Sequence, residues 1–234
     1  MNALSQKTEL SLQERLLKVQ ERIAAAAHRS GRDLSSIELI AVSKTYPAEK
    51  IRELMDEGVT LFGESRLQEA LSKIPLLPAR LRWHYIGHLQ TNKVRKALPL
   101  FELFHSVDTL ELAMEIDRIA AERGLFPRVL LEVNVSGEGS KYGFSSKVLE
   151  PSLEQLLALP RLQVEGFMTM APITSDPETT RPFFAHLREL RDHLASQSGI
   201  PLSTLSMGMS NDYEIAIEEG ATLVRVGSAI FGER

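Results

Sequence analysis

The sequence contains no cysteine among its 234 residues. This absence excludes disulfide bonds, a thiolate nucleophile and cysteine-ligated metals, and it is compatible with a reducing compartment. No apolar run approaches the ~18 residues that a membrane helix requires. Residues 1–9 are polar and lack the apolar core of a signal peptide. We therefore expect a cytoplasmic protein with no membrane partner.

An excess of basic charge is also missing. The 27 basic and 31 acidic residues leave a net charge of −4, which gives no reason to expect nucleic acid as a partner. The chain has no linker rich in proline, glycine or serine and no low-complexity tract. With 43% hydrophobic and 25% charged residues, its composition is typical of a globular protein. These features predict one domain over residues 1–234.

Hydrophobic periodicity predicts a regular alternation of strands and helices after a first helix within residues 1–31. Ser11 and Glu14 form a capping-box pattern at the start of that helix. Asp108 is predicted to cap a later helix, and Pro177 to open a long one. The predicted strands are residues 37–44, 60–63, 83–87, 103–107, 128–135, 162–170, 202–207 and 222–226.

Eight strands that alternate with helices are typical of a parallel sheet covered by helices. Eight such units in a chain of 234 residues, close to the ~250 residues typical of such barrels, favour a closed (β/α)8 TIM barrel over an open doubly wound sheet. The sequence therefore predicts an α/β protein with a barrel over residues 37–232 and an extra N-terminal helix within residues 1–31.

Lys44 ends the first predicted strand abruptly. Alternation with a period of two places Ile40, Val42 and Lys44 on one face of this strand. One interpretation is a strand-end lysine whose stem lies along apolar surface while its amine reaches water. The other is an amine with a lowered pKa, held at the mouth of a pocket, that condenses with a carbonyl group.

Two segments with glycine and serine follow the seventh and eighth predicted strands, where barrels commonly hold a phosphate. Glycines allow backbone N–H groups to approach an anion closely. Each segment alone is also explained by turn glycines and a helix cap, but two on adjacent loops favour a phosphate site. Its predicted residues are Ser206, Met207, Gly208, Met209, Ser210, Gly227 and Ser228.

Arg225 lies inside the last apolar strand, on the same face as Leu223 and Gly227. It could form an ion pair with a carboxylate of a neighbouring strand, such as Glu132. Its functional alternative is a fixed hydrogen-bond donor to a ligand.

A lysine, a phosphate site and an arginine at one barrel mouth match the needs of pyridoxal 5′-phosphate (PLP). In this hypothesis Lys44 forms a Schiff base with PLP, and Arg225 donates to the pyridine nitrogen. An arginine stays protonated and therefore disfavours the pyridinium form, which weakens the ring as an electron sink.

Six motifs run in order from the first strand to the C-terminus. They are Ala-Val-Ser-Lys-Thr (41–45), Phe-Gly-Glu-Ser (62–65), Trp-His-Tyr-Ile-Gly (83–87), Leu-Gln-Thr-Asn-Lys (89–93), Leu-Ser-Met-Gly-Met-Ser (205–210) and Val-Arg-Val-Gly-Ser-Ala-Ile-Phe-Gly (224–232). Together they resemble the YggS/PROSC family of PLP homeostasis proteins over almost the whole chain.

This resemblance implies a barrel like the N-terminal domain of alanine racemase, usually monomeric, with PLP on Lys44. It also implies phosphate contacts from residues 206–210, 227 and 228, with Arg225 at the pyridine nitrogen. The family more often has asparagine where this chain has Ser65, and a serine has one donor where an amide has two. That departure weakens the case for a cofactor contact at Ser65.

Several other residues are weaker candidates for the pocket. Asn134 and Met170 stand at predicted strand ends, and the family-like Lys141 could lie near the pocket mouth or on the surface. His84 is interpreted as a hydrogen-bonded core histidine. The other histidines show no catalytic or metal-ligand spacing, so we expect no metal.

Two classes of function fit these observations. One is a PLP homeostasis or carrier protein without a dedicated turnover reaction, with apo PLP enzymes as acceptors. The other is an amino acid racemase or decarboxylase on the same barrel. Such enzymes carry a second, β-rich domain, for which the sequence leaves no room after Val226. A Schiff-base aldolase or phosphosugar isomerase is disfavoured by the full set of motifs. We therefore expect no catalytic residues.

Overall fold

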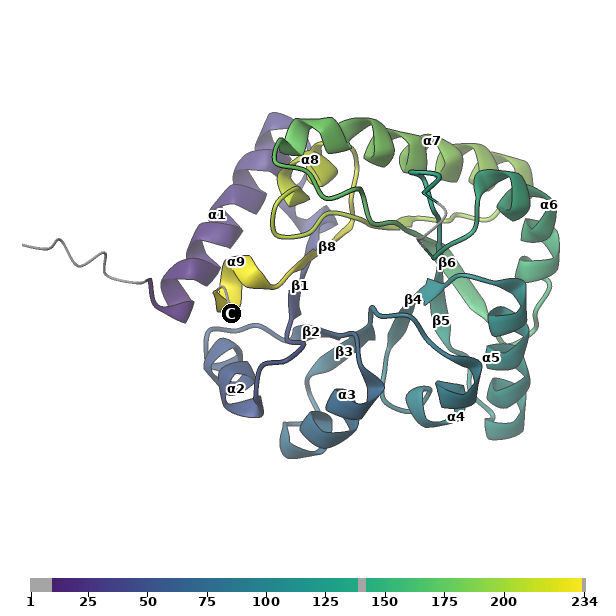
Figure 1. Cartoon of the computed structure of the whole chain (residues 1–234), viewed down its shortest axis with the longest axis horizontal. Helices are drawn as coiled ribbons and strands as arrows, with labels where there is room; N and C mark the ends of the chain where they lie inside the picture. The colour runs from purple at the N-terminus through teal and green to yellow at the C-terminus, as the bar shows by residue number, and fades with distance from the viewer. Residues whose placement is uncertain (1–9, 139–141, 233–234) are drawn as a thin grey trace, which may run out of the picture.

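Eight parallel strands form a closed barrel in the order of the sequence, surrounded by helices (Figure 1). The computed structural model describes residues 10–138 and 142–232. The strands are β1 (Glu38–Val42), β2 (Leu61–Glu64), β3 (Arg82–Tyr85), β4 (Leu103–Val107), β5 (Arg128–Glu132), β6 (Gln163–Met168), β7 (Thr204–Ser206) and β8 (Leu223–Val226). The predicted (β/α)8 barrel is confirmed.

The helices follow the strands in regular alternation. They are α1 (Leu12–Arg29), α2 (Ala48–Asp56), α3 (Leu67–Lys73), α4 (Val94–Ala97), α5 (Leu110–Arg123), α6 (Ser146–Leu157), α7 (Arg181–Ser198), α8 (Tyr213–Glu218) and α9 (Ser228–Phe231). Short 3-10 helices lie at Leu34–Ser36, Ile74–Leu76, Thr91–Lys93 and Pro177–Thr180.

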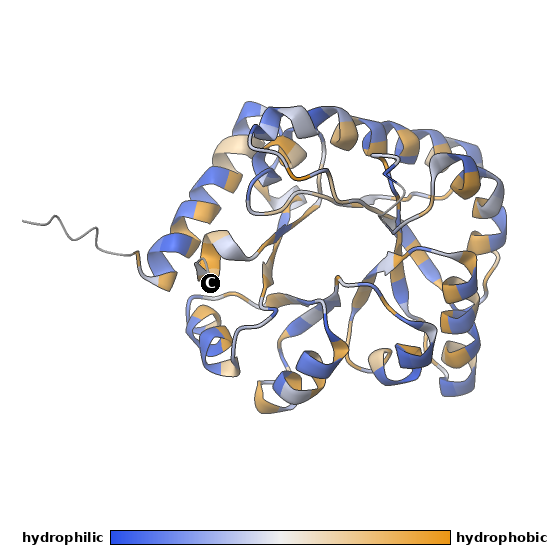
Figure 2. Cartoon of the chain, viewed as in Figure 1, coloured by the Kyte–Doolittle hydropathy of each residue, from blue (hydrophilic) through white to orange (hydrophobic). Residues whose placement is uncertain are grey.

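Two separate hydrophobic layers hold the barrel together. The larger layer lies between the strands and the helices, whose apolar stripes alternate with polar ones (Figure 2). The smaller layer lies inside the barrel because its members alternate along their strands with residues of the outer layer. It consists of Ile40, Leu61, Leu103, Leu130, Met168 and Leu223. A polar interior at the carboxyl ends of the strands lies beyond this layer.

The helix α1 is the predicted extra N-terminal helix. Its capping box is present, with the Ser11 hydroxyl accepting from the Glu14 N–H group at 3.1 Å. The helix lies beside α8 and α9 (Figure 1), and Arg15 Nε donates to the Ile230 carbonyl at 2.7 Å. Hence α1 closes the side of the barrel where β8 meets β1.

Several predicted details were wrong, among them the ends of β1, β3 and β6, which stop two residues before the predicted positions. The cap of α5 is Thr109, which accepts from the Leu112 N–H group, because the carboxylate of Asp108 is bound instead to His88. Strand β5 ends at Glu132 rather than at residue 135. The segment opened by Pro177 begins as a 3-10 helix before α7, and the sequence pattern did not predict α9.

Among the described residues, no helix combines the length and the apolar character needed to cross a membrane. Residues 1–9, for which no signal peptide was predicted, lie outside the described residues. The same holds for the candidate Lys141 and for the C-terminal Arg234.

Candidate functional site

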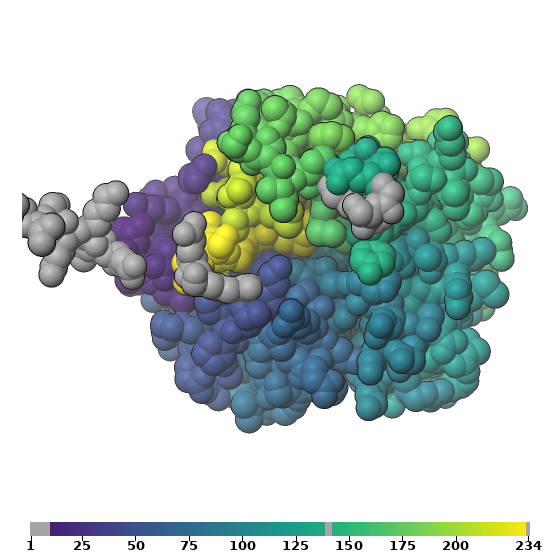
Figure 3. Space-filling view, in the orientation of Figure 1, coloured from purple at the N-terminus to yellow at the C-terminus, as the bar shows by residue number. Residues whose placement is uncertain are grey.

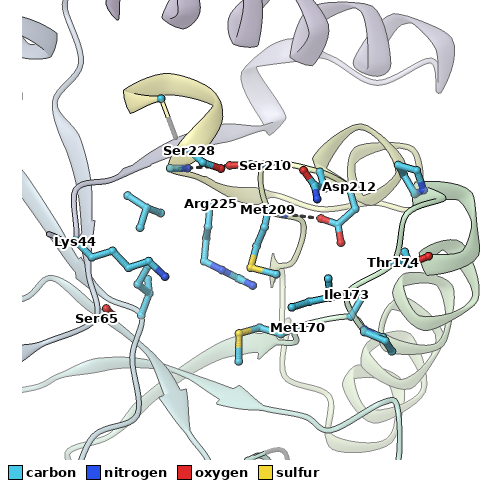
Figure 4. Close-up of a pocket in the computed structure, with 18 of the residues that line it drawn as sticks. Lys44, Ser65, Met170, Ile173, Thr174, Met209, Ser210, Asp212, Arg225 and Ser228 are labelled. Atoms are coloured by element: carbon cyan, nitrogen blue, oxygen red, sulfur yellow. Dashed lines mark hydrogen bonds between the residues drawn. The ribbon is translucent and has the colours of Figure 1, made fainter. Parts of the chain in front are cut away.

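Lys44 follows the carboxyl end of β1 and is exposed at the barrel mouth. Ile40 belongs to the layer inside the barrel, and Val42 lines the same cavity as Lys44, so the predicted face is the inner one. In Figure 4 the amine of Lys44 points across the cavity toward the guanidinium of Arg225. Lys44 is therefore both exposed and directed into a cavity.

A buried ionic network holds the turn that carries Lys44. Lys73 Nζ donates to the Ser43 carbonyl at 2.9 Å and to Glu64 Oε1 at 2.7 Å. Thr45 has a left-handed backbone with φ of 69°, and its N–H group donates to Glu69 Oε2 at 2.6 Å. Such a conformation costs about 1–3 kcal/mol for a residue other than glycine and is kept only where neighbours hold it. Residues of β2 and α3 thus fix the position of Lys44.

The cavity has a volume of about 500 Å³, within the usual size of a small-molecule site. In the space-filling view, residues of the C-terminal segments meet those that follow β1 at the centre of this face (Figure 3). The predicted residues that line the cavity are Lys44, Met209, Ser210, Arg225, Gly227 and Ser228, and Ser65 and Met170 line it too.

Three predicted site residues do not line the cavity. Ser206 is fully buried beneath Arg225, and Met207 is fully buried in the core between strands and helices. Gly208 has φ of +90°, and a Cβ atom there would lie 2.5 Å from the Cβ atom of Ala216. Gly208 therefore shapes the turn after β7 rather than contacting the cavity.

Backbone donors converge at the predicted phosphate site. The N–H groups of Gly227 and Ala229 both donate to the Ser210 hydroxyl, at 3.2 and 3.3 Å. The Met209 N–H group donates to Asp212 Oδ1 at 2.6 Å, which holds the neighbouring turn (Figure 4). One oxygen atom therefore already occupies a point on which two backbone donors converge.

Arg225 is buried, with 4% of its surface exposed. Its guanidinium donates to the Ser206 hydroxyl and, at 2.9 Å, to the Thr169 carbonyl. Within the described residues no ion pair joins Arg225 to Glu132, so that alternative is not observed. Burial lowers the pKa of Arg225 to about 10, opposed by the negative charges of Asp212 and Glu132. The group stays protonated at neutral pH.

The family described as alanine racemase, N-terminal domain, matches residues 16–234. A pyridoxal phosphate homeostasis protein of Aquifex aeolicus is 47% identical over 222 residues, covering 94% of this chain and 97% of the relative. The chain belongs to the pyridoxal phosphate homeostasis protein family. A member from Escherichia coli K12 is 40% identical over 235 residues, covering 94% of this chain and 95% of its own length.

Solved structures agree with this assignment. PipY of Synechococcus elongatus with PLP bound is 41% identical and superposes with a TM-score of 0.80, covering 92% of this chain and all of PipY. An alanine racemase of Clostridium difficile is 17% identical with a TM-score of 0.72, covering 93% of this chain and 60% of the racemase. The likeness to the racemase shows a shared fold alone.

Within this family fold, the cavity includes residues that sequence reasoning missed. Val42 was detectable, because alternation along the first strand puts it on the same face as Lys44. Tyr46 and Asp212 lie outside the strands, so no such alternation indicated them. The loop residues Ile173 and Thr174 had no local signal, because only tertiary contacts place that loop over the mouth.

The structure places the remaining polar residues of the sequence analysis differently. Asn134 does not line the cavity. His84 is 2% exposed and hydrogen-bonded to His105, which confirms the prediction of a core histidine. His88 Nδ1 lies 3.0 Å from Asp108 Oδ2, a pairing that no motif spacing indicated.

Proposed function

We propose that this chain binds PLP and acts in PLP homeostasis, with the cofactor held on Lys44 as a Schiff base. One observation carries the proposal. Lys44, the protonated Arg225 and Ser210 line one cavity at the barrel mouth, and the N–H groups of Gly227 and Ala229 converge on the Ser210 hydroxyl. The names of the relatives and the PLP bound to PipY support the same reading.

The phosphate end of PLP fits the two backbone donors. The neutral hydroxyl oxygen of Ser210 stands where an anionic phosphate oxygen would accept from Gly227 and Ala229. A rotation of the Ser210 side chain would free both N–H groups and let the hydroxyl donate to the phosphate as well.

The ring end of PLP fits Arg225. When bound, PLP supplies an aldehyde that condenses with amines and a ring that withdraws electrons. Arg225 has donors left after its bonds to Ser206 and Thr169, and its guanidinium can donate to an unprotonated ring nitrogen. This donor leaves the ring a weak electron sink, which suits a protein that holds PLP without turnover.

The proposal extends to what the protein does with the cofactor. We infer a cytoplasmic, monomeric carrier without a dedicated reaction, which releases PLP to apo PLP enzymes. A racemase-like activity is the alternative, and the homeostasis names of the relatives at 36–47% identity do not favour it.

Absorption spectroscopy tests the proposal. The purified full chain with added PLP is expected to show an imine band near the visible edge, and borohydride reduction should fix the label on Lys44, as read by peptide mass spectrometry. Lys44→Ala should lose the band. The control Lys50→Ala removes an exposed lysine that pairs with Glu53 and should keep it.

Two results would contradict the proposal. A protein that takes up no PLP would refute cofactor binding altogether. Racemisation of amino acids at enzyme-like rates would favour the racemase alternative.

A further inference from the structure

Four buried polar side chains form a continuous hydrogen-bonded chain through the barrel interior. Arg225 of β8 donates to the Ser206 hydroxyl of β7. Ser206 Oγ lies 2.8 Å from His105 Nδ1 of β4, and His105 Nε2 lies 3.0 Å from His84 Nδ1 of β3. None of the four is more than 4% exposed. This series of hydrogen-bonded side chains therefore links the PLP cavity to the opposite half of the barrel wall.

The far end of this chain reaches a second cavity. His84 lines a cavity of about 220 Å³ together with Glu38, Arg82 and Arg128, which stand at the amino ends of their strands. His84 Nε2 is buried and has no hydrogen-bond partner within the described part of the chain. The chain of side chains thus spans the barrel from its carboxyl-end mouth to its amino-end mouth.

The donors and acceptors of these four side chains favour one direction, in which only the outer proton, on His84 Nε2, lacks a partner among the described residues. A guanidinium can only donate, so Ser206 Oγ accepts from Arg225. The Ser206 hydroxyl hydrogen then goes to an unprotonated His105 Nδ1. A neutral His105 carries its proton on Nε2 and donates to His84 Nδ1, which leaves the His84 proton on Nε2.

The opposite direction leaves two buried groups unsatisfied instead of one. A proton on His105 Nδ1 would donate to Ser206 Oγ, which already accepts from Arg225. Arg225 and His105 are the partners of Ser206 Oγ in the described structure, and in this direction both of them donate. The Ser206 hydroxyl hydrogen would therefore have no acceptor. The unprotonated His84 Nε2 would also lack a donor, whereas the first direction leaves only the His84 Nε2 proton unpaired. Each unsatisfied buried polar group is costly, so the first direction is favoured.

Both histidines must be neutral for this arrangement, and their surroundings favour that state. Burial lowers the pKa of His84 to about 4, and burial lowers the pKa of His105 well below its ordinary value. The positive charge of Arg225 acts on His105 in the same direction. Each ring therefore holds one proton at neutral pH.

We propose that Ser206 and His105 are positioning residues for Arg225. His105 draws the Ser206 hydroxyl hydrogen away from the guanidinium, so that a lone pair of Ser206 Oγ faces Arg225. With the Thr169 carbonyl as second acceptor, the guanidinium is held in one orientation and its remaining donors face the cavity. The expected effect on PLP binding rests on the proposed function. The direction of the hydrogen bonds from Arg225 to His84 does not.

NMR of the PLP-free full chain tests the direction. Long-range ¹H–¹⁵N correlation spectra distinguish a histidine protonated on Nε2 from one protonated on Nδ1. Both His84 and His105 are expected to carry their proton on Nε2 at pH 7. A proton on Nδ1 of His105 would overturn the inference, whether or not the protein binds PLP.

Two substitutions of His105 test the positioning role. In His105→Asn the side-chain amide takes the place of Nδ1 beside Ser206, whereas in His105→Gln it takes the place of Nε2 beside His84. His105→Asn should keep the PLP band and a Kd within about threefold of wild type, because the contact with Ser206 survives. His105→Gln should weaken binding by about tenfold or more and shift the band.

The outcomes separate this inference from the proposed function. Equal effects of His105→Asn and His105→Gln on Kd and band would mean that His105 is merely structural. If neither variant folds, Ser206→Ala decides, because it removes the acceptor of Arg225 and should weaken PLP binding; unchanged binding would refute the role. A wild-type chain that binds no PLP would refute the proposed function and leave the NMR result standing.

Discussion

Arg225 shows how much a single residue depends on its acceptors. Its partners are a hydroxyl and a carbonyl, both neutral, although the carboxylates of Asp212 and Glu132 act on it from further away. A guanidinium without a bound carboxylate keeps donors available for a ligand. For this reason we assign Arg225 to the proposed PLP site rather than to a structural ion pair.

Replacing Arg225 tests whether its guanidinium donates to the PLP ring. Arg225→Ala is expected to raise the Kd for PLP about tenfold or more and to alter the imine absorption, because the donor to the ring is lost. Arg225→Lys keeps the charge but loses the planar fork, so it should not restore the wild-type spectrum. Spectrophotometric titration with PLP measures both. Unchanged binding and spectrum in Arg225→Ala would contradict the role.

The turn between β7 and α8 is the element on which the proposed phosphate site depends. Gly208 packs against α8, and its carbonyl accepts from the Arg225 N–H group at 3.0 Å. Its left-handed backbone and the close approach of Ala216 both require glycine. The turn therefore sets Met209 and Ser210 relative to β8.

Two glycine substitutions separate backbone strain from steric clash. Gly199 has φ of +71° with open space around it, so Gly199→Ala should lower the free energy of unfolding by about 1 kcal/mol. Gly208→Ala adds an atom within 2.8 Å of the Tyr213 Cα atom, and its total cost should be about 3 kcal/mol. Urea unfolding measures both, and equal losses would contradict the packing described for this turn.

The whole molecule carries ionisable groups in its interior, which makes its stability depend on pH. Burial and the neighbouring charge of Asp108 raise the pKa of Glu132 from its ordinary value of 4.5 to about 7, against the effect of Arg225. The folded state then binds this proton more tightly than the unfolded state. Ionising Glu132 therefore costs stability as pH rises from about 4.5 to about 7.

Glu132→Gln should remove this dependence. One pKa unit corresponds to about 1.4 kcal/mol, so wild type should lose up to roughly 3 kcal/mol relative to Glu132→Gln between pH 4.5 and pH 8. His84 and His105 have lowered pKa values and destabilise the fold as pH falls below 6.5, but this effect is common to both proteins and cancels. Denaturant unfolding at several pH values measures the difference. A constant difference would refute the assignment.

The sequence alone predicted the architecture because strand and helix periods are local properties. Apolar runs and alternation indicated all eight strands, and the same period showed which strand residues share a face with Lys44 and Arg225; the structure shows that these faces are the inner ones. The cap at Thr109 was missed because Asp108, the stronger capping type, is bound to His88 from another part of the chain. Helix α9 was missed because its four residues show no period.

The sequence by itself determined the barrel, the residues that share a strand face with Lys44 and Arg225, and the resemblance to the PLP homeostasis family. Only the tertiary structure decided which polar groups meet. His105 and Ser206 are 101 residues apart, and Arg225 lies opposite Ile40 only because β8 closes onto β1. Side-chain alternation is a property of each strand, whereas the contacts across the barrel depend on closure and register.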